Sequence, residues 1–130
     1  MNTATEARHP IFVDFRAARI VIQSMHREDD AQHVQTLALV VMPDHIHWLF
    51  QLTGDRDLSR CVNNMKSFAT RKINRRVGRK GRLWQRGYFD RAIRRDEDLA
   101  DVARYIVANP VRAGLVSSVR DYSHWDAIWL

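Results

Sequence analysis

Two short apolar runs, residues 35–42 and 45–52, stand on either side of the pair Pro43-Asp44. Both runs are rich in β-branched and aliphatic side chains, a composition typical of strands, and a Pro-Asp pair is typical of a turn. The sequence therefore predicts a β-hairpin, and every fold considered for this chain has to contain it.

The segments before and after this hairpin carry the spacing of amphipathic helices. Residues 14–27 form the first segment, with Asp14 as the expected N-cap, and the second begins at Leu58, with Asp57 as its expected cap. The two glycines of "VGRKGR" end the second pattern. The apolar positions at helical spacing are Phe15, Ala18, Ile22 and Met25 in the first segment and Leu58, Val62, Met65, Phe68 or Ala69, and Ile73 in the second.

The second half of the chain predicts one more strand and one more helix. The strand is expected over residues 83–93. The stretch "RDEDLADVARYIVANP" predicts a helix that Asp96 caps and Pro110 stops, with Glu97 and Asp98 in the first turn, where acidic groups interact favourably with the helix dipole.

The predicted order is helix, strand, strand, helix, strand, helix, in one domain over residues 1–130. This order favours an α+β fold in which helices cover one face of an antiparallel sheet. A further strand before the first helix would complete a ferredoxin-like β-α-β-β-α-β arrangement. Only the short segment "NTATE" is available for it, so the N-terminal strand is expected to be largely missing.

The chain holds one cysteine, Cys61, which excludes a disulfide within the chain and a zinc site built on several thiolates. An intracellular, cytoplasmic location is therefore expected. The longest continuous apolar run, Leu37 to Met42, is far too short to cross a bilayer, so no membrane association is expected.

Positive charge is concentrated in one segment of the chain. Residues 56–95 hold 14 of the 21 Lys and Arg side chains and only two acidic ones, whereas the other residues carry 7 basic and 13 acidic side chains. Such an asymmetry indicates a surface for a polyanion such as nucleic acid, with an ordinary solvated surface as the alternative.

The second run of the hairpin contains His45 and His47. Side chains at positions i and i+2 of a strand point to the same side, so both imidazoles share one face, and Ile46, Trp48 and Phe50 share the other. Two neighbouring imidazoles can bind one metal ion, but such pairs also arise by chance among six histidines. Spacing alone favours ordinary surface or hydrogen-bonded histidines.

Tyr105 and Asn109 lie four positions apart in the last predicted helix, on the flank of its apolar stripe. Taken alone, the tyrosine packs its ring there and the asparagine before proline ends the helix. Together with the histidine pair and the basic segment, they suggest a phosphate that is polarised by a metal ion and attacked by the tyrosine hydroxyl.

Three stretches, "VVMPDHIHWLF", "LWQRGYFDRAIRRDEDL" and "ARYIVANPVRAGLV", resemble the signatures of the REP-associated tyrosine transposases. These belong to the single-tyrosine class named HUH after its histidine-hydrophobic-histidine motif. The resemblance covers about residues 9–116. It implies metal-dependent nicking and rejoining of single-stranded DNA at hairpin-forming palindromic repeats, through a 5′-phosphotyrosine intermediate and a free 3′-hydroxyl group.

Residue by residue, the resemblance implies that His45 and His47 bind the metal ion, that Asn109 is its third ligand, and that Tyr105 is the nucleophile. The metal of the family is Mg²⁺ or Mn²⁺, a choice that ligand types alone leave open. Single-stranded or hairpin DNA is the expected partner, with a homodimer as one option. In the family a first strand lies beside the histidine strand, so its near absence here implies an exposed sheet edge and a loosened metal site.

Basic side chains of the charged segment are expected to neutralise DNA phosphates. Trp84 and Tyr88 are candidates for stacking on unpaired bases, with core packing as the alternative. Two other functions stay open: a truncated or domesticated relative that binds DNA hairpins without cleaving them, and a metal-dependent phosphoesterase, which would need a second histidine motif. The expected DNA-binding residues are Arg60, Lys66, Arg71, Lys72, Arg75, Arg76, Arg79, Lys80, Arg82 and Arg86.

Overall fold

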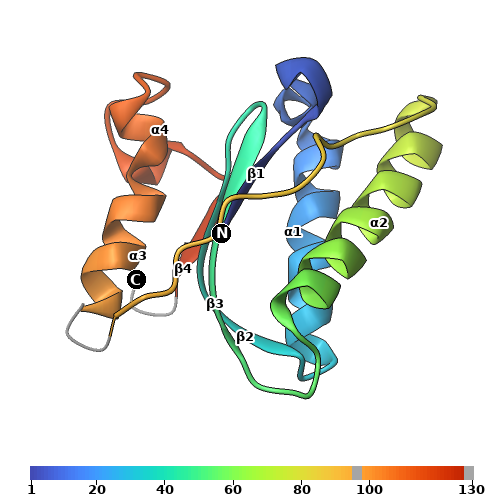
Figure 1. The fold of residues 1–130 in the computed structure, drawn as a ribbon. Helices are drawn as coiled ribbons and strands as arrows, with labels where there is room; N and C mark the ends of the chain where they lie inside the picture. Colours follow the sequence, from blue (N-terminus) through green and yellow to red (C-terminus); the bar gives the residue numbers. More distant parts are fainter. Residues whose placement is uncertain (95–97, 128–130) are drawn as a thin grey trace.

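The computed structural model describes residues 1–94 and 98–127. It has an α+β fold with four antiparallel strands. The helices and strands in chain order, shown in Figure 1, are β1 (Asn2–Ala4), α1 (Phe15–Asp30), β2 (Val34–Val41), β3 (His45–Leu52), α2 (Leu58–Val77), α3 (Leu99–Val107), α4 (Asn109–Arg112) and β4 (Trp125–Ala127), with short 3₁₀ helices at Glu6–Arg8, Ile11–Val13 and Val119–Asp121.

The predicted hairpin forms the centre of the sheet, whose strand order is β1-β3-β2-β4. Strands β2 and β3 pair with Val40 opposite His47 and Val41 opposite Ile46. The backbone N–H of Met42 donates to the carbonyl of His45 at 2.8 Å and closes the turn at Pro43-Asp44. The turn therefore fixes the register, which in turn decides the face to which each histidine points.

The N-terminal strand is as short as expected, but it covers the edge beside the histidines. Ala4 pairs with His45 and Asn2 with His47, and the backbone N–H of Trp48 donates to the carbonyl of Met1 at 2.9 Å. The expected open edge at the histidine pair is thus closed by residues 1–4, and the prediction of an unpaired edge there is wrong.

The predicted strand over residues 83–93 is wrong as a continuous strand. This segment pairs with residues 2–5 through isolated bridges, of Trp84 with Thr5 and of Phe89 with Asn2. Between these bridges the backbone turns at Gly87, whose φ of 76° suits glycine. The fourth strand of the sheet is instead β4, which follows the last helix and was not predicted.

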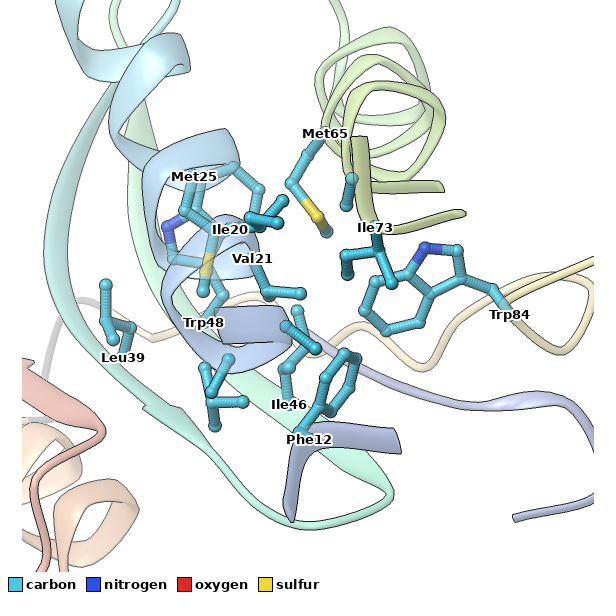
Figure 2. Close-up of a cluster of buried hydrophobic side chains, with 14 of the residues drawn as sticks. Phe12, Ile20, Val21, Met25, Leu39, Ile46, Trp48, Met65, Ile73 and Trp84 are labelled. Carbon is cyan, nitrogen blue, oxygen red and sulfur yellow. The ribbon is translucent and has the colours of Figure 1, made fainter. Parts of the chain in front are cut away.

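The sheet has helices on both faces, not on one face as predicted, because α3 packs on the face opposite α1 and α2 (Figure 1). Helices α1 and α2 cover one face and enclose the main apolar core, in which Ile46 and Trp48 of β3 meet Val21 and Met25 of α1 and Met65 of α2 (Figure 2). Helix α3 lies on the other face over a smaller apolar cluster. In the part of the chain that the structure describes, no helix combines the length and apolarity needed to cross a membrane.

Both long helices begin at the predicted caps. The carboxylate of Asp14 accepts the backbone N–H groups of Arg16 and Ala17, and that of Asp57 accepts the N–H of Arg60. Phe15 was predicted to face the core, which is wrong: its side chain is 56% exposed because the buried stripe of α1 passes through Ala17 and the positions that follow it.

Helix α3 starts later than predicted. Asp98, expected in the first turn, is the N-cap and accepts the backbone N–H of Ala100, whereas the predicted cap Asp96 lies outside the described residues, as does Glu97. The helix ends at Val107, and Pro110 lies in the first turn of α4, a position where its missing N–H costs no hydrogen bond.

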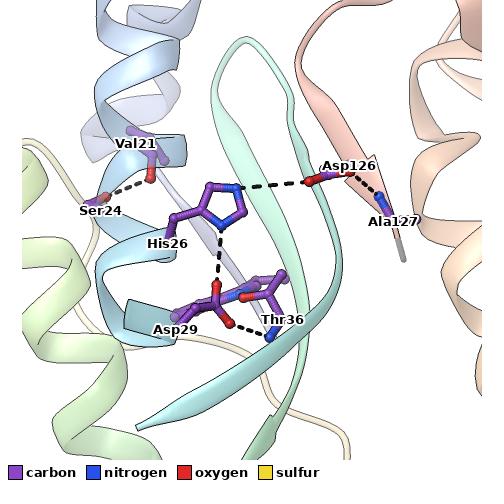
Figure 3. A network of polar contacts seen from close by, with 8 residues as sticks. Val21, Ser24, His26, Asp29, Thr36, Asp126 and Ala127 are labelled. Atoms are coloured by element: carbon purple, nitrogen blue, oxygen red, sulfur yellow. Dashed lines mark hydrogen bonds and ion pairs between the residues drawn. The ribbon is translucent and has the colours of Figure 1, made fainter. Parts of the chain in front are cut away.

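A network of polar side chains connects β4 with helix α1 and strand β2 (Figure 3). Nδ1 of His26 on α1 lies 3.2 Å from Oδ2 of Asp29, and Nε2 of His26 lies 4.0 Å from Oδ2 of Asp126 on β4. Asp29 also accepts the backbone N–H of Thr36 on β2 at 2.6 Å. The imidazole of His26 and the carboxylate of Asp29 therefore together link α1, β2 and β4.

Candidate active site

The two histidines occupy the sheet face that α3 covers. Their ring centroids are 5.0 Å apart in an edge-to-face arrangement. Leu49, two residues further along the same face of β3, belongs to the apolar cluster that also contains Ala103 and Val107 of α3. Strand alternation thus brings the imidazoles to the layer that carries the predicted tyrosine.

Asp44, the second residue of the hairpin turn, orients the first of these imidazoles. Its Oδ1 lies 2.7 Å from Nδ1 of His45, and its Oδ2 lies 3.2 Å from Nε of Arg8. A carboxylate accepts, so Nδ1 of His45 carries the proton and the lone pair of Nε2 is left free for another partner. The role of Asp44 was not predicted, although its position directly before His45 is the signal for it.

His47 is held in its neutral form. Burial is the largest cause that lowers its pKa from 6.5 to about 4, followed by the positive charges of His45, the amino group of Met1 and the Arg112 guanidinium. A neutral imidazole is the form that binds a metal ion.

Tyr105 is 66% exposed on α3, and its ring is covered on one side by Arg112 of α4. The guanidinium carbon lies 3.6 Å from the ring centroid, and Nη2 of Arg112 donates to the backbone carbonyl of Tyr105 at 2.6 Å. The charge of Arg112 is also the smallest of the causes that lower the pKa of His47. Arg112 was not among the predicted site residues.

Asn109 lies at the start of α4, where its Nδ2 donates to the carbonyl of Ile106 at 2.8 Å. This bond leaves Oδ1 as the atom for a ligand. Among the residues that the structure describes, no hydrogen bond joins Tyr105 or Asn109 to either imidazole, and no His, Cys, Asp or Glu completes a group of three that could hold a metal ion. The imidazoles of His45 and His47 are thus the two candidate ligands that the structure brings together.

The predicted DNA-binding side chains divide into two groups. The ammonium group of Lys66 donates to the carbonyls of Gln85 and Gly87, and burial lowers its pKa; the guanidinium of Arg79 donates to Oδ1 of Asn74. These two side chains hold the segment that follows α2. The remaining eight are exposed: Arg60, Arg71, Lys72, Arg75, Arg76, Lys80, Arg82 and Arg86.

The two aromatic candidates for base stacking are not equivalent. Trp84 is only 4% exposed and packs its ring 5.4 Å from that of Phe12, so core packing is the alternative that the structure supports. Tyr88 is half-buried, with its hydroxyl 2.8 Å from that of Ser59.

Similar proteins are found both by sequence and by structure. A protein of Haemophilus influenzae that carries the name of a REP-associated tyrosine transposase is 35% identical over 100 residues, covering 69% of this chain and 57% of that protein. The REP-associated tyrosine transposase of Escherichia coli is 34% identical over 86 residues, covering 65% of this chain and 49% of that protein. The chain thus spans about half the length of the curated relatives it matches.

The structure of a REP-associated tyrosine transposase bound to a REP hairpin superposes on 95% of this chain and 72% of that one, with a TM-score of 0.77 and 24% identity. At this identity the likeness shows the shared fold. The model of the family described as "Transposase IS200 like" matches residues 3–109, a range that contains both histidines, Tyr105 and Asn109. By this match over most of its length, the chain belongs to the IS200-like transposase family.

Proposed function

We propose that the chain is a metal-dependent transposase that nicks and rejoins single-stranded DNA at hairpin-forming palindromic repeats. The observation that carries this proposal is the imidazole pair of His45 and His47, whose ring centroids lie 5.0 Å apart on the sheet face covered by α3, the helix of Tyr105. Membership of the family and the REP hairpin in the related structure support the choice of substrate.

The proposed reaction forms a bond between Oη of Tyr105 and the phosphorus of a DNA phosphate, and breaks the bond from that phosphorus to the 3′ oxygen. The exposed hydroxyl loses its proton to water, and the departing 3′ oxygen takes a proton from water. The products are a 5′-phosphotyrosine and a free 3′-hydroxyl group. In the reverse direction a 3′-hydroxyl group attacks the phosphorus and releases the tyrosine, which rejoins the strand.

His45, His47 and Asn109 would hold the divalent ion, Mg²⁺ or Mn²⁺, whose chemistry is to polarise a phosphate oxygen. Asp44 orients the imidazole of His45, and the low pKa of His47 keeps its ring free of a competing proton at neutral pH. Arg112 binds the attacked phosphate beside Tyr105, since a guanidinium group pairs well with phosphate oxygens.

Labelled hairpin oligonucleotides with a single-stranded flank, incubated with the protein and Mn²⁺, test the proposal on denaturing gels. We expect a covalent protein–DNA adduct that Tyr105→Phe abolishes and that Tyr88→Phe, the matched loss of a different hydroxyl, leaves in place. Cleavage that persists in Tyr105→Phe would reject the nucleophile. Binding of the hairpin without any adduct would instead identify a binding protein that does not cut.

A further inference from the structure

Three arginine side chains line a pocket on the side of the sheet opposite the histidine pair. The pocket has a volume of about 210 Å³ and lies between α1 and α2, which cover the other face of the sheet. Most of its lining is polar, and the side chains used below are Arg27, Glu28, His33, Arg56, Asn64 and Arg71.

The acidic group of this pocket is already paired inside the protein. Glu28 is only 6% exposed, and its Oε1 lies 3.3 Å from Nδ1 of His33. Its charge also acts on the Cys61 thiol, whose pKa is raised by burial and then by Glu28. The carboxylate therefore belongs to the pocket floor and has a partner there.

The three arginines at the rim have no such partner. Within residues 1–94 and 98–127, none of Arg27, Arg56 and Arg71 forms an ion pair with a carboxylate. The guanidinium carbon of Arg27 lies over the ring of Phe68, 3.8 Å from its centroid, a contact that restrains the group. Three cations thus face one buried, paired anion.

The pocket also lies along a basic stripe of α2. Counting from Arg60, polar and aromatic side chains of α2 recur at spacings of four, four, three and four residues, which places them on one helix face: Arg60, Asn64, Phe68, Arg71 and Arg75. At the rise of an α-helix this stripe is about 22 Å long. A strand that follows it would pass over the pocket mouth.

We propose that this pocket is a phosphate-binding site, in which the guanidinium groups of Arg27, Arg56 and Arg71 hold one phosphate group as an anchor away from the cleavage site. Guanidinium groups match the oxygens of phosphate through paired N–H bonds, and Asn64 adds an amide donor. The phosphate comes either from a DNA backbone or from a free phosphate compound. Only the DNA source rests on the proposed function; the chemistry of the pocket does not.

Inorganic phosphate is the first probe, because it needs no knowledge of the DNA target. In NMR spectra of the ¹⁵N-labelled full chain, we expect saturable shifts of the Nε–H signals of Arg27, Arg56 and Arg71, with the signal of Arg120 unmoved. In Arg56→Gln/Arg71→Gln, the shift at Arg27 is expected to disappear. Absence of saturable shifts at these arginines in the wild-type chain would overturn the proposal, and folding of the variant is checked by circular dichroism.

The salt dependence of hairpin binding separates the two sources. Removing one phosphate contact lowers the slope of log K against log salt concentration by about 1. We expect that reduction in Arg71→Gln and not in Arg120→Gln, which loses the same charge from an exposed site outside the pocket. Phosphate shifts with an unchanged slope would assign the pocket to a free phosphate compound. If the chain binds no DNA, the proposed function fails, and the phosphate titration alone decides the pocket.

Discussion

The two imidazoles of the candidate metal site differ in their surroundings. His45 is oriented by a carboxylate that is itself paired with Arg8. His47 instead lies partly buried among positive charges, which together with burial lower its pKa to about 4. The first ring is thus held in place by a hydrogen bond, and the second is kept neutral by its environment.

This difference predicts a loss of stability at acid pH that depends on His47. Its pKa is about 4 in the folded chain, below the ordinary value of 6.5, so the unfolded chain binds the proton more readily. With EDTA present, the contribution of the neutral His47 ring to the free energy of unfolding is complete above pH 6.5. It is lost as the pH falls towards 4. Between pH 7.5 and 5, we expect the free energy of unfolding of the wild type to drop by about 1 kcal/mol more than that of His47→Gln. This figure is smaller than the pKa shift alone implies, because the His47 ring is partly exposed to solvent. Equal losses in urea titrations of the two proteins would contradict this pKa.

Arg112 predicts a second effect at the residue scale. If its guanidinium binds the attacked phosphate, Arg112→Ala removes charge-assisted hydrogen bonds and lowers the rate of adduct formation about 10- to 100-fold. Arg112→Lys keeps the charge but loses the planar group that stacks on Tyr105, so an intermediate rate is expected. Single-turnover assays with a labelled hairpin measure both rates. An unchanged rate in Arg112→Ala would remove this residue from the site.

Some of these residues could be found from the sequence and others could not. Strand alternation predicts that His45 and His47 share a face, because the rule needs only two neighbouring positions. Arg112 reaches the ring of Tyr105 seven residues away, because the chain turns at Ala108 and starts a new helix through Pro110. Pro110 was expected only to end a helix, and no second helix was predicted after it. Helical spacing therefore could not predict the contact of Arg112 with the ring of Tyr105.

At the scale of elements, residues 83–89 act as a cover for the short first strand. Backbone bonds of 2.8 and 2.9 Å join Asn2 and Phe89 in both directions, and the N–H of Gln85 donates to Ala4 at 2.9 Å. Lys66 fastens this cover to α2 through the carbonyls of Gln85 and Gly87. The histidine strand is therefore bordered by the short strand β1 and, beyond it, by the irregular backbone of residues 83–89.

Lys66→Met tests this fastening. The methionine fills similar space but donates no hydrogen bond, so the free energy of unfolding is expected to fall by about 1 kcal/mol, a value that allows for the partial exposure of the ammonium group. Lys80→Met, at an exposed position, is the matched control and should change stability little. Urea unfolding followed by circular dichroism measures both. Equal effects would show that the charge matters and the two carbonyl contacts do not.

The elements that were predicted correctly are those with many periodic positions. The hairpin, α1 and α2 each have a run of apolar side chains at regular spacing and, for the helices, a capping aspartate. Strand β4 is three residues long, too short for any period, and depends on contacts made from far away in the chain, such as that of Asp126 with His26. The segment 83–93 has apolar side chains like a strand, but Gly87 turns its backbone.

For the whole molecule, the sheet separates two apolar regions of unequal size. The main core lies under the two long helices, α1 and α2. The second lies under the nine-residue α3 and consists of Leu37, Ala38 and Leu49 of the central strands, Ala103 and Val107 of α3, and Ala127 of β4. The predicted nucleophile is thus carried by the smaller layer, which has less buried apolar surface to hold it.

This inequality predicts that the layer with Tyr105 opens before the rest of the chain unfolds. Val107→Ala removes two buried carbons from the small cluster. This change should lower the free energy needed to open α3 locally by about 2 kcal/mol. The backbone amides of α3 should exchange with solvent faster, while the global melting temperature changes little.

Val21→Ala is the matched control, because it makes the same change in the main core. It should instead lower the melting temperature and speed hydrogen exchange throughout the chain. Hydrogen exchange read by mass spectrometry distinguishes these patterns. If Val107→Ala destabilises both layers equally, the two regions unfold as one unit, and the nucleophile is no more mobile than the strand that carries the histidines.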